Sequence, residues 1–134
     1  MAVELAIPHI DAGIVTNDRA AALAFWHETL GFPVEGEISF PGLTIVRLKV
    51  GETTLRLCIP DTAAPHLAHP GPFDQQTGLR YLTLAVRNLD AILEKVAAKG
   101  YPIPYPAREI RPGTRAAQIQ DGAGVTVELM ERRG

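Results

Sequence analysis

Hydrophobic and polar residues alternate along several short segments of the chain, which is the period of a half-buried β-strand. Two other segments have apolar residues at helical spacing, each preceded by Asp or Asn and followed by Gly, the residues that begin and end helices. The pattern predicts helices between Asp18 and Gly31 and between Asn88 and Gly100. It predicts strands at about 9–15, 34–40, 43–50, 53–59, 81–86, 103–110, 114–120 and 125–131.

The two halves of the chain repeat this order of elements. In each half the Asp or Asn cap lies seven residues after a residue of the first strand, Asp11 or Tyr81, and a leucine follows five residues later. Each half is therefore a βαβββ module, one at about 8–60 and the other at about 78–131. The connector 61–77 contains several prolines and is unsuited to a helix or a central strand. We expect a single domain, 1–134, of the α+β class.

Successive residues of a strand point to opposite sides of the sheet, so the first and last strand of each module have two distinct faces. One face is aliphatic and is expected to pack under the helices: Ile10, Ala12, Ile14, Leu55, Leu57, Ile59, Leu82, Leu84, Val86, Val125, Val127 and Leu129. The other is mixed: His9, Asp11, Gly13, Val15, Thr54, Arg56, Cys58, Tyr81, Thr83, Ala85, Thr126, Glu128 and Met130. This second face is either solvated or the wall of a binding site.

Four polar residues hold matching places in the repeat. Asp11 and Tyr81 are equivalent on the two first strands, and Arg56 and Glu128 are near-equivalent on the two last strands. If the modules pair about a pseudo-twofold axis, these four side chains converge on one concave surface. Arg47 and Lys49 alternate along a third strand and either rim that surface, where they would attract an anion, or form a solvated edge.

Composition narrows the class of partner. With 13 Lys and Arg against 15 Asp and Glu, the net charge is −2, which gives no reason to expect nucleic acid or an anionic membrane. No apolar run reaches the roughly 18 residues of a membrane span, and the N-terminus lacks the pattern of a signal peptide. The single cysteine fits a reducing compartment. We expect a cytoplasmic protein with a small-molecule ligand.

Several segments resemble the vicinal oxygen chelate superfamily, which includes glyoxalase I, extradiol dioxygenases and the bleomycin-resistance proteins. Residues 11–32, with Gly-Ile-Val-Thr-Asn-Asp, Phe25-Trp26 and Leu30-Gly31-Phe32, are similar to its first module. Residues 81–100 and 121–129 are similar to its second module. The resemblance covers residues 8–131. It implies two βαβββ modules forming a half-barrel cup with the helices outside, and a homodimer.

Members of this superfamily that use a metal place histidine at the start of each first strand and glutamate or histidine on each last strand. Those places are held here by Asp11, Arg56, Tyr81 and Glu128, so only Glu128 keeps the usual residue. Arg56 has no lone pair and repels a cation, and Tyr81 is a poor ligand at a pKa of about 10. The resemblance thus implies a protein without metal or other cofactor, with a divalent metal as the alternative.

The same four residues permit acid–base chemistry. Arg56 would keep one carboxylate ionised, the like charge would raise the pKa of the other, and Tyr81 would donate to a developing oxyanion. We expect a metal-independent isomerase, epimerase, hydrolase or lyase with Asp11, Arg56, Tyr81 and Glu128 as catalytic residues. The alternatives are a protein that sequesters a small molecule or antibiotic, a structural salt-bridge network, and, less favoured, a metal-dependent glyoxalase or dioxygenase.

The remaining candidates have structural interpretations. His66 and His69 lie among prolines, so they lack the helical geometry that would place two ligands on one metal. Their segment is interpreted as a connector, with an arm that closes over a site as the alternative. Cys58 is interpreted as a small buried residue, and His9 as a partly solvated residue at the strand entrance.

Overall fold

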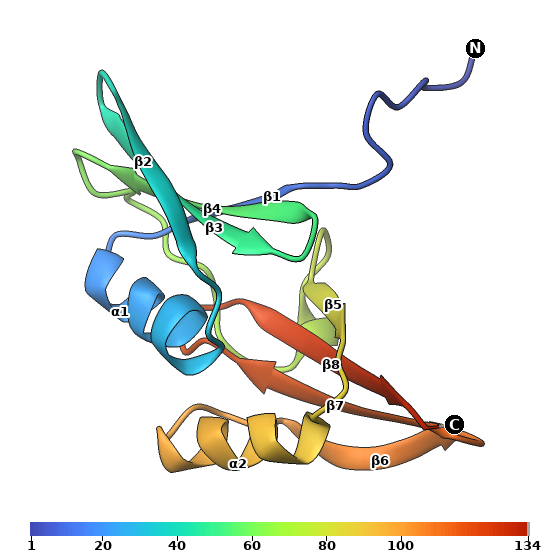
Figure 1. Cartoon of the computed structure of the whole chain (residues 1–134). Coiled ribbons are helices and arrows are strands. Elements are labelled where there is room, and N and C mark those ends of the chain that lie inside the picture. The colour runs from blue at the N-terminus through green and yellow to red at the C-terminus, as the bar shows by residue number, and fades with distance from the viewer. Residues whose placement is uncertain (134) are drawn as a thin grey trace. The chain divides into compact units, whose positions relative to one another are not determined.

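The computed structural model describes residues 1–133 and divides the chain into two compact units (Figure 1). The first unit is Met1–Pro65, and the second runs from His66 to the C-terminus. The boundary lies inside the predicted connector 61–77. Each unit contains one four-stranded sheet, and the two sheets have the same strand order.

The first unit is a βαβββ unit with sheet order β1-β4-β3-β2. Strands β1 and β4 run parallel, and the other neighbours are antiparallel. Helix α1 lies against β4 and continues directly into a π-helical segment, η1. The elements are β1 (Ala12–Val15), α1 (Arg19–Leu23), η1 (Ala24–Thr29), β2 (Val34–Phe40), β3 (Leu43–Val50) and β4 (Thr53–Pro60).

The second unit repeats this topology with sheet order β5-β8-β7-β6, in which β5 and β8 are the parallel pair. Helix α2 lies against β8. A single 3-10 turn, η2, precedes the sheet. The elements are η2 (Phe73–Gln75), β5 (Tyr81–Ala85), α2 (Leu89–Ala98), β6 (Tyr105–Arg111), β7 (Thr114–Gln120) and β8 (Thr126–Arg132). The α+β class and the repeated module are therefore confirmed.

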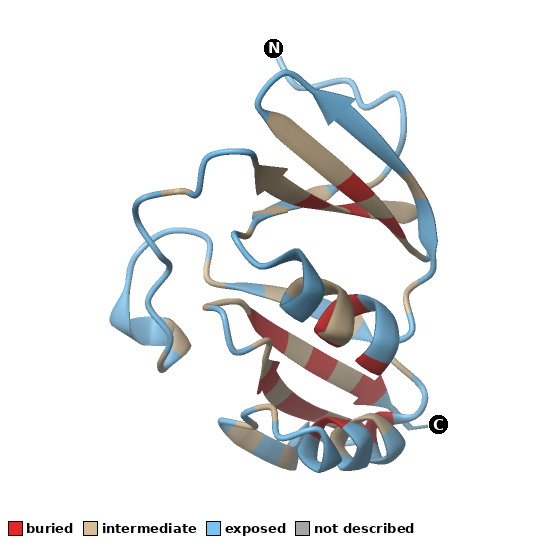
Figure 2. Cartoon of the chain, turned by 90° about the vertical axis from the view of Figure 1, so that its left-hand side faces the viewer, coloured by how far each residue is buried: buried red, intermediate tan, exposed pale blue. Residues whose placement is uncertain are grey.

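The predicted faces hold for most strand positions, and Figure 2 shows the buried residues in bands along the strands. The buried apolar residues of the first unit are Phe25, Trp26, Val46, Leu48, Leu55 and Leu57. Those of the second unit are Leu89, Val96, Ala116, Ala117, Ile119, Val127 and Leu129. No helix among residues 1–133 is both long enough and apolar enough to cross a lipid bilayer.

Two residues depart from the predicted faces. Ile10 was expected in the core but is 85% exposed, because β1 begins only at Ala12. Ala12 is level with Leu55, so β4, which begins at Thr53, reaches only two residues further in the direction of Ile10. Thr126 was expected on the polar face but is 2% exposed. Its hydroxyl accepts a hydrogen bond from the Gln120 amide at 3.3 Å.

From His66 onward, the connector packs against the second unit and is hydrogen-bonded to it. The Gln120 amide donates to the carbonyl of Gly71 at 2.8 Å, and the Arg80 Nε donates to the carbonyl of Phe73 at 2.8 Å. Ala68 packs so closely on Gly124 that a Cβ there would lie 2.5 Å from the Ala68 Cβ. These contacts fix the segment on its own unit.

The first helix begins and ends as predicted but is not a regular α-helix. The Asp18 carboxylate accepts a hydrogen bond from the Ala21 amide at 2.9 Å, which is an N-cap. After Leu23 the chain widens into the π-helix, where the Leu30 amide donates to the Phe25 carbonyl at 3.0 Å. A π-helix turns less per residue than an α-helix. Phe25 and its neighbour Trp26 are both buried, with ring centroids 4.8 Å apart.

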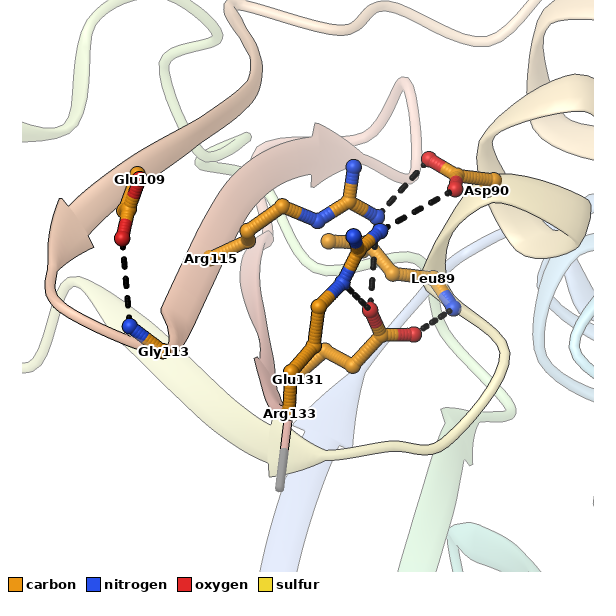
Figure 3. A network of polar contacts seen from close by, with 7 residues as sticks. All are labelled: Leu89, Asp90, Glu109, Gly113, Arg115, Glu131 and Arg133. Atoms are coloured by element: carbon orange, nitrogen blue, oxygen red, sulfur yellow. Dashed lines mark hydrogen bonds and ion pairs between the residues drawn. The ribbon is translucent and has the colours of Figure 1, made fainter.

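The start of α2 differs from the prediction that Asn88 caps it. The Asn88 side chain makes no capping hydrogen bond. Instead, the Leu89 amide donates at 2.9 Å to the carboxylate of Glu131, which is 8% exposed and comes from β8. Figure 3 shows that Arg115 and Arg133 also contact this carboxylate, at 3.3 and 3.4 Å. Glu131 therefore ties the helix to the sheet.

Replacing Glu131 with Gln is expected to lower the melting temperature by several degrees at neutral pH, because two arginines lose a buried anion. The Leu89 amide is the main cause that holds the pKa of Glu131 below its usual 4.5, assisted by the two arginines. The ionised form therefore favours folding at any pH above that value, and this contribution disappears as the pH falls through the lower pKa of the folded state.

Thermal unfolding between pH 2 and pH 7 tests this. The control is Glu109→Gln, since Glu109 is exposed and its carboxylate accepts only a turn hydrogen bond from the Gly113 amide at 3.1 Å. Equal melting temperatures for the two variants would contradict the assigned role of Glu131.

Candidate functional site

The first unit brings Asp11 and Arg56 together as predicted. Asp11 directly precedes β1, and Arg56 lies on β4 level with Gly13. The Arg56 guanidinium approaches the Asp11 carboxylate at 3.2 Å, and both side chains are partly exposed. The parallel pairing of β1 and β4 thus makes neighbours of two residues that are 45 positions apart.

The Asp11 carboxylate is saturated with donors. The Thr54 amide donates to one oxygen at 2.8 Å, the His9 ring nitrogen lies 3.4 Å from the same oxygen, and Arg56 contacts the other. The Thr54 hydrogen bond, followed by Arg56, holds the pKa of Asp11 below its usual 3.8. Asp11 is therefore a stable anion that orients Arg56.

A second arginine completes the polar row across the first sheet. In the register of the sheet, Gly13, Arg56, Arg47 and Gly36 follow one another from β1 to β2 and share one face. Arg47 was predicted to lie on this strand, β3, but its position opposite Arg56 was not predicted. The signal was present in the two-residue turn Gly51-Glu52, because counting outward from it places Arg47 opposite Arg56.

The second unit has a matching row of uncharged donors and acceptors around Glu128. Thr83, Glu128, Gln118 and Tyr105 follow one another from β5 to β6. The Thr83 hydroxyl donates to the Glu128 carboxylate at 3.0 Å. The side-chain oxygen of Gln118 is buried without a hydrogen-bond partner. This row is chemically suited to hold a polar ligand.

Tyr81 lies on β5 level with Thr126, two residues from the position of Glu128 and on the same face of the sheet. It is 41% exposed, and its ring meets that of Phe73 edge to face, with centroids 5.6 Å apart. The structure thus groups the four predicted residues in two pairs, one in each unit. Convergence of the two pairs on one surface stays a prediction.

The four residues at the metal-ligand positions of the superfamily do not suit a metal ion. At the matching positions, Arg56 offers no lone pair and has its charge directed at Asp11. Among residues 1–133, no group of three or more His, Cys, Asp or Glu side chains could hold a metal ion. The remaining carboxylate, Glu128, already accepts the Thr83 hydroxyl.

A hollow of about 470 Å³ in the second unit does not include any predicted site residue. It lies at the start of α2, among the ion pairs of Figure 3. Its two acidic residues, Asp90 and Glu131, are both paired with Arg115 and Arg133. We assign this hollow to the structural network around Glu131. Its lining is Arg87, Asn88, Asp90, Ala91, Glu131, Arg132 and Arg133.

Comparison with solved structures places the fold among known proteins. A glyoxalase family protein from Enterococcus faecalis is 26% identical, with a TM-score of 0.70 over 93% of this chain and 96% of that chain. One from Bacillus cereus is 18% identical, with a TM-score of 0.82 over 100% and 99%. TnmS3, an antibiotic binding protein from Streptomyces sp. CB03234, is 23% identical, with a TM-score of 0.69 over 96% and 99%.

A comparison with curated protein sequences finds no match. A sequence model of the Glyoxalase/Bleomycin resistance protein/Dioxygenase superfamily, however, matches residues 6–129, which is nearly the whole chain. The match spans both βαβββ units and includes all four predicted site residues. This chain therefore belongs to the Glyoxalase/Bleomycin resistance protein/Dioxygenase superfamily.

Proposed function

We propose that this protein binds a small polar organic molecule through the polar faces of its sheets, without a metal ion. The observation that carries the proposal is the ion pair between Arg56 and Asp11, 3.2 Å apart, at positions where metal-using members carry ligands. A guanidinium there supplies a fixed positive charge and several hydrogen-bond donors. Asp11 holds the guanidinium in place, and the remaining donors of Arg56 can orient a ligand directly.

The polar face of the second unit carries mostly uncharged groups that suit a polar ligand. Thr83, Gln118 and Tyr105 present hydroxyl and amide groups along one row, and Tyr81 adds an exposed ring and hydroxyl. Small-molecule sites combine apolar surface with a few placed polar groups of this kind. The fold is shared with an antibiotic binding protein, which supports binding as a use of this architecture.

Acid–base catalysis is the second candidate, and the contacts favour Glu128 over Asp11 as its proton acceptor. Asp11 accepts hydrogen bonds from Thr54 and Arg56 and has a lowered pKa, so it is a weak base. The Glu128 carboxylate accepts one hydroxyl at 3.0 Å and lies on the same face as Tyr81. Glu128 could remove a proton and Tyr81 could stabilise the resulting oxyanion. The homodimer stays a prediction in either case.

The metal-free proposal predicts that protein purified without chelator carries far less than one equivalent of Zn, Ni, Fe or Mn by elemental analysis. After chelator treatment, an NMR screen of small organic acids and amides should still find compounds that shift the backbone amides of Arg56 or Glu128. A stoichiometric metal whose removal abolishes these shifts would contradict the proposal.

The assignment of Asp11 as an anchor predicts its titration. Carboxyl-detected NMR should give a pKa for Asp11 below 3.8, and Arg56→Gln should raise this pKa while the Thr54 hydrogen bond keeps it partly lowered. Arg19→Gln is the control, because Arg19 is paired with Glu37 elsewhere in the unit. A pKa of Asp11 above the usual value would contradict its role as an anchor and would make Asp11 a candidate general base.

The catalytic candidate predicts deuterium exchange at carbon next to a carbonyl. In heavy water, pyruvate or 2-oxobutyrate should incorporate deuterium faster with the protein than without it. Glu128→Gln should slow this exchange at least ~100-fold, the scale of a lost general base. If Glu128→Gln leaves the exchange rate unchanged, Glu128 is not the base. If the unaltered protein does not speed up the exchange, the catalytic candidate loses its support and only the ligand-binding proposal remains.

A further inference from the structure

The polar face of the first sheet carries three cationic side chains at neighbouring positions. Arg47 on β3 lies directly opposite Arg56 on β4, and Lys49 lies two residues further along β3, opposite Thr54. Residues two apart on a strand share a face. Like charges placed directly opposite each other in a sheet destabilise it. The stability of the unit therefore does not explain why the two arginines lie opposite each other, and the arrangement requires another reason.

The carboxylates of this unit do not neutralise the cluster. Asp11 contacts Arg56 only, and its other oxygen is taken by Thr54 and His9. Glu37 neighbours Gly36 on β2, but its side chain is on the opposite face, where it pairs with Arg19. Among residues 1–133, the pair of Arg56 with Asp11 is the only ion pair that these three cations make.

Arg47 itself has no protein partner. Across residues 1–133, its guanidinium takes part in no hydrogen bond or ion pair, and its Nε is buried without an acceptor. A buried donor that is left unsatisfied costs free energy unless a ligand or water satisfies it. A purely structural arginine would have its own carboxylate or carbonyl.

Gly36 makes room for this guanidinium. Gly36 is level with Arg47, and a Cβ at Gly36 would lie 2.9 Å from the Arg47 Nη2. Its φ lies outside the left-handed region, so the backbone there does not require glycine. Glycine weakens a strand interior and often marks a place where another group approaches closely. The approaching group here is the Arg47 side chain.

We infer that Arg47, Arg56 and Lys49 form an anion site that binds the carboxylate or phosphate group of a small organic ligand. The inference deepens the proposed function and rests on it, because it names the charged group by which the ligand is held. Two adjacent guanidinium groups offer parallel N–H donors that match the paired oxygens of either group. Asp11 fixes Arg56 from the side, which prepares the site before the ligand arrives.

The test follows the arginine Nε–H signals by NMR. Inorganic phosphate and, in a separate arm, benzoate are titrated at constant ionic strength kept with sodium chloride. The Nε–H signals of Arg47 and Arg56 should shift and saturate in at least one arm, and the tighter arm identifies the anion class. Arg47→Gln should weaken that binding at least about tenfold, as expected for a lost charge-assisted hydrogen bond.

Two controls separate a ligand site from a structural cluster. Arg111→Gln removes one charge from an exposed arginine of the other unit and should leave the affinity unchanged. Arg47→Gln should leave the melting temperature equal or higher, because it relieves repulsion with Arg56. A clear fall in melting temperature would mark Arg47 as structural and overturn the inference.

Gly36→Ala tests the geometry without changing charge. The added methyl group should displace the Arg47 guanidinium and weaken anion binding, while the far-UV spectrum stays the same. Gly13→Ala is the matched control on the same row, since its Cβ would meet only the Cys58 Sγ at an ordinary 3.9 Å. Equal affinities for the two variants would contradict the assigned position of Arg47.

The anion test can fail independently of the proposed function. If neither phosphate nor benzoate shifts the Arg47 and Arg56 signals, or if Arg47→Gln behaves like Arg111→Gln, the anion site is wrong. Metal-free binding of other compounds at Arg56 or Glu128 would then still support the proposed function. A stoichiometric metal would overturn the proposed function, whatever the anions do.

Discussion

The direct parallel pairing of the first and last strand in each unit is the constraint on which the rest of the structure depends. A parallel pair needs a long connection, which consists of α1, η1, β2 and β3 in one unit and of α2, β6 and β7 in the other. The pairing makes neighbours of residues 45 positions apart in both units: Asp11 with Arg56, and Thr83 with Glu128. The four site residues predicted from the repeat, Asp11, Arg56, Tyr81 and Glu128, lie on or next to these paired strands.

The two units use the same row of positions for different chemistry. In the first, Arg56 and Arg47 form a cationic pair that a single carboxylate only partly offsets. In the second, the equivalent positions are occupied by Glu128, an acid, and Gln118, an amide. A charged row of this kind costs stability in an isolated sheet, and proteins retain such costs where a function requires them. We propose that the cationic row of the first unit is retained because it binds the anionic group of a ligand.

Most of the fold could be predicted because it depends on local signals. Alternation placed the strands, and Asp18 is an N-cap whose partner is three residues away. The start of α2 could not be predicted from its neighbours, because its cap is Glu131, 42 residues away in sequence. Asp11 and Arg56 were found through the repeat. Arg47 was not placed, although the turn at Gly51 fixed its register, because a lone arginine on a strand resembles a solvated edge.

The central claim is that charged side chains replace the metal of this family. A titration with Mn²⁺ tests it most directly, because this paramagnetic ion broadens the NMR signals of residues near it. The account predicts only weak, non-saturating broadening at Asp11, Arg56, Tyr81 and Glu128, comparable to that at exposed acids elsewhere. Saturable broadening confined to these four residues at one equivalent of Mn²⁺ would contradict it.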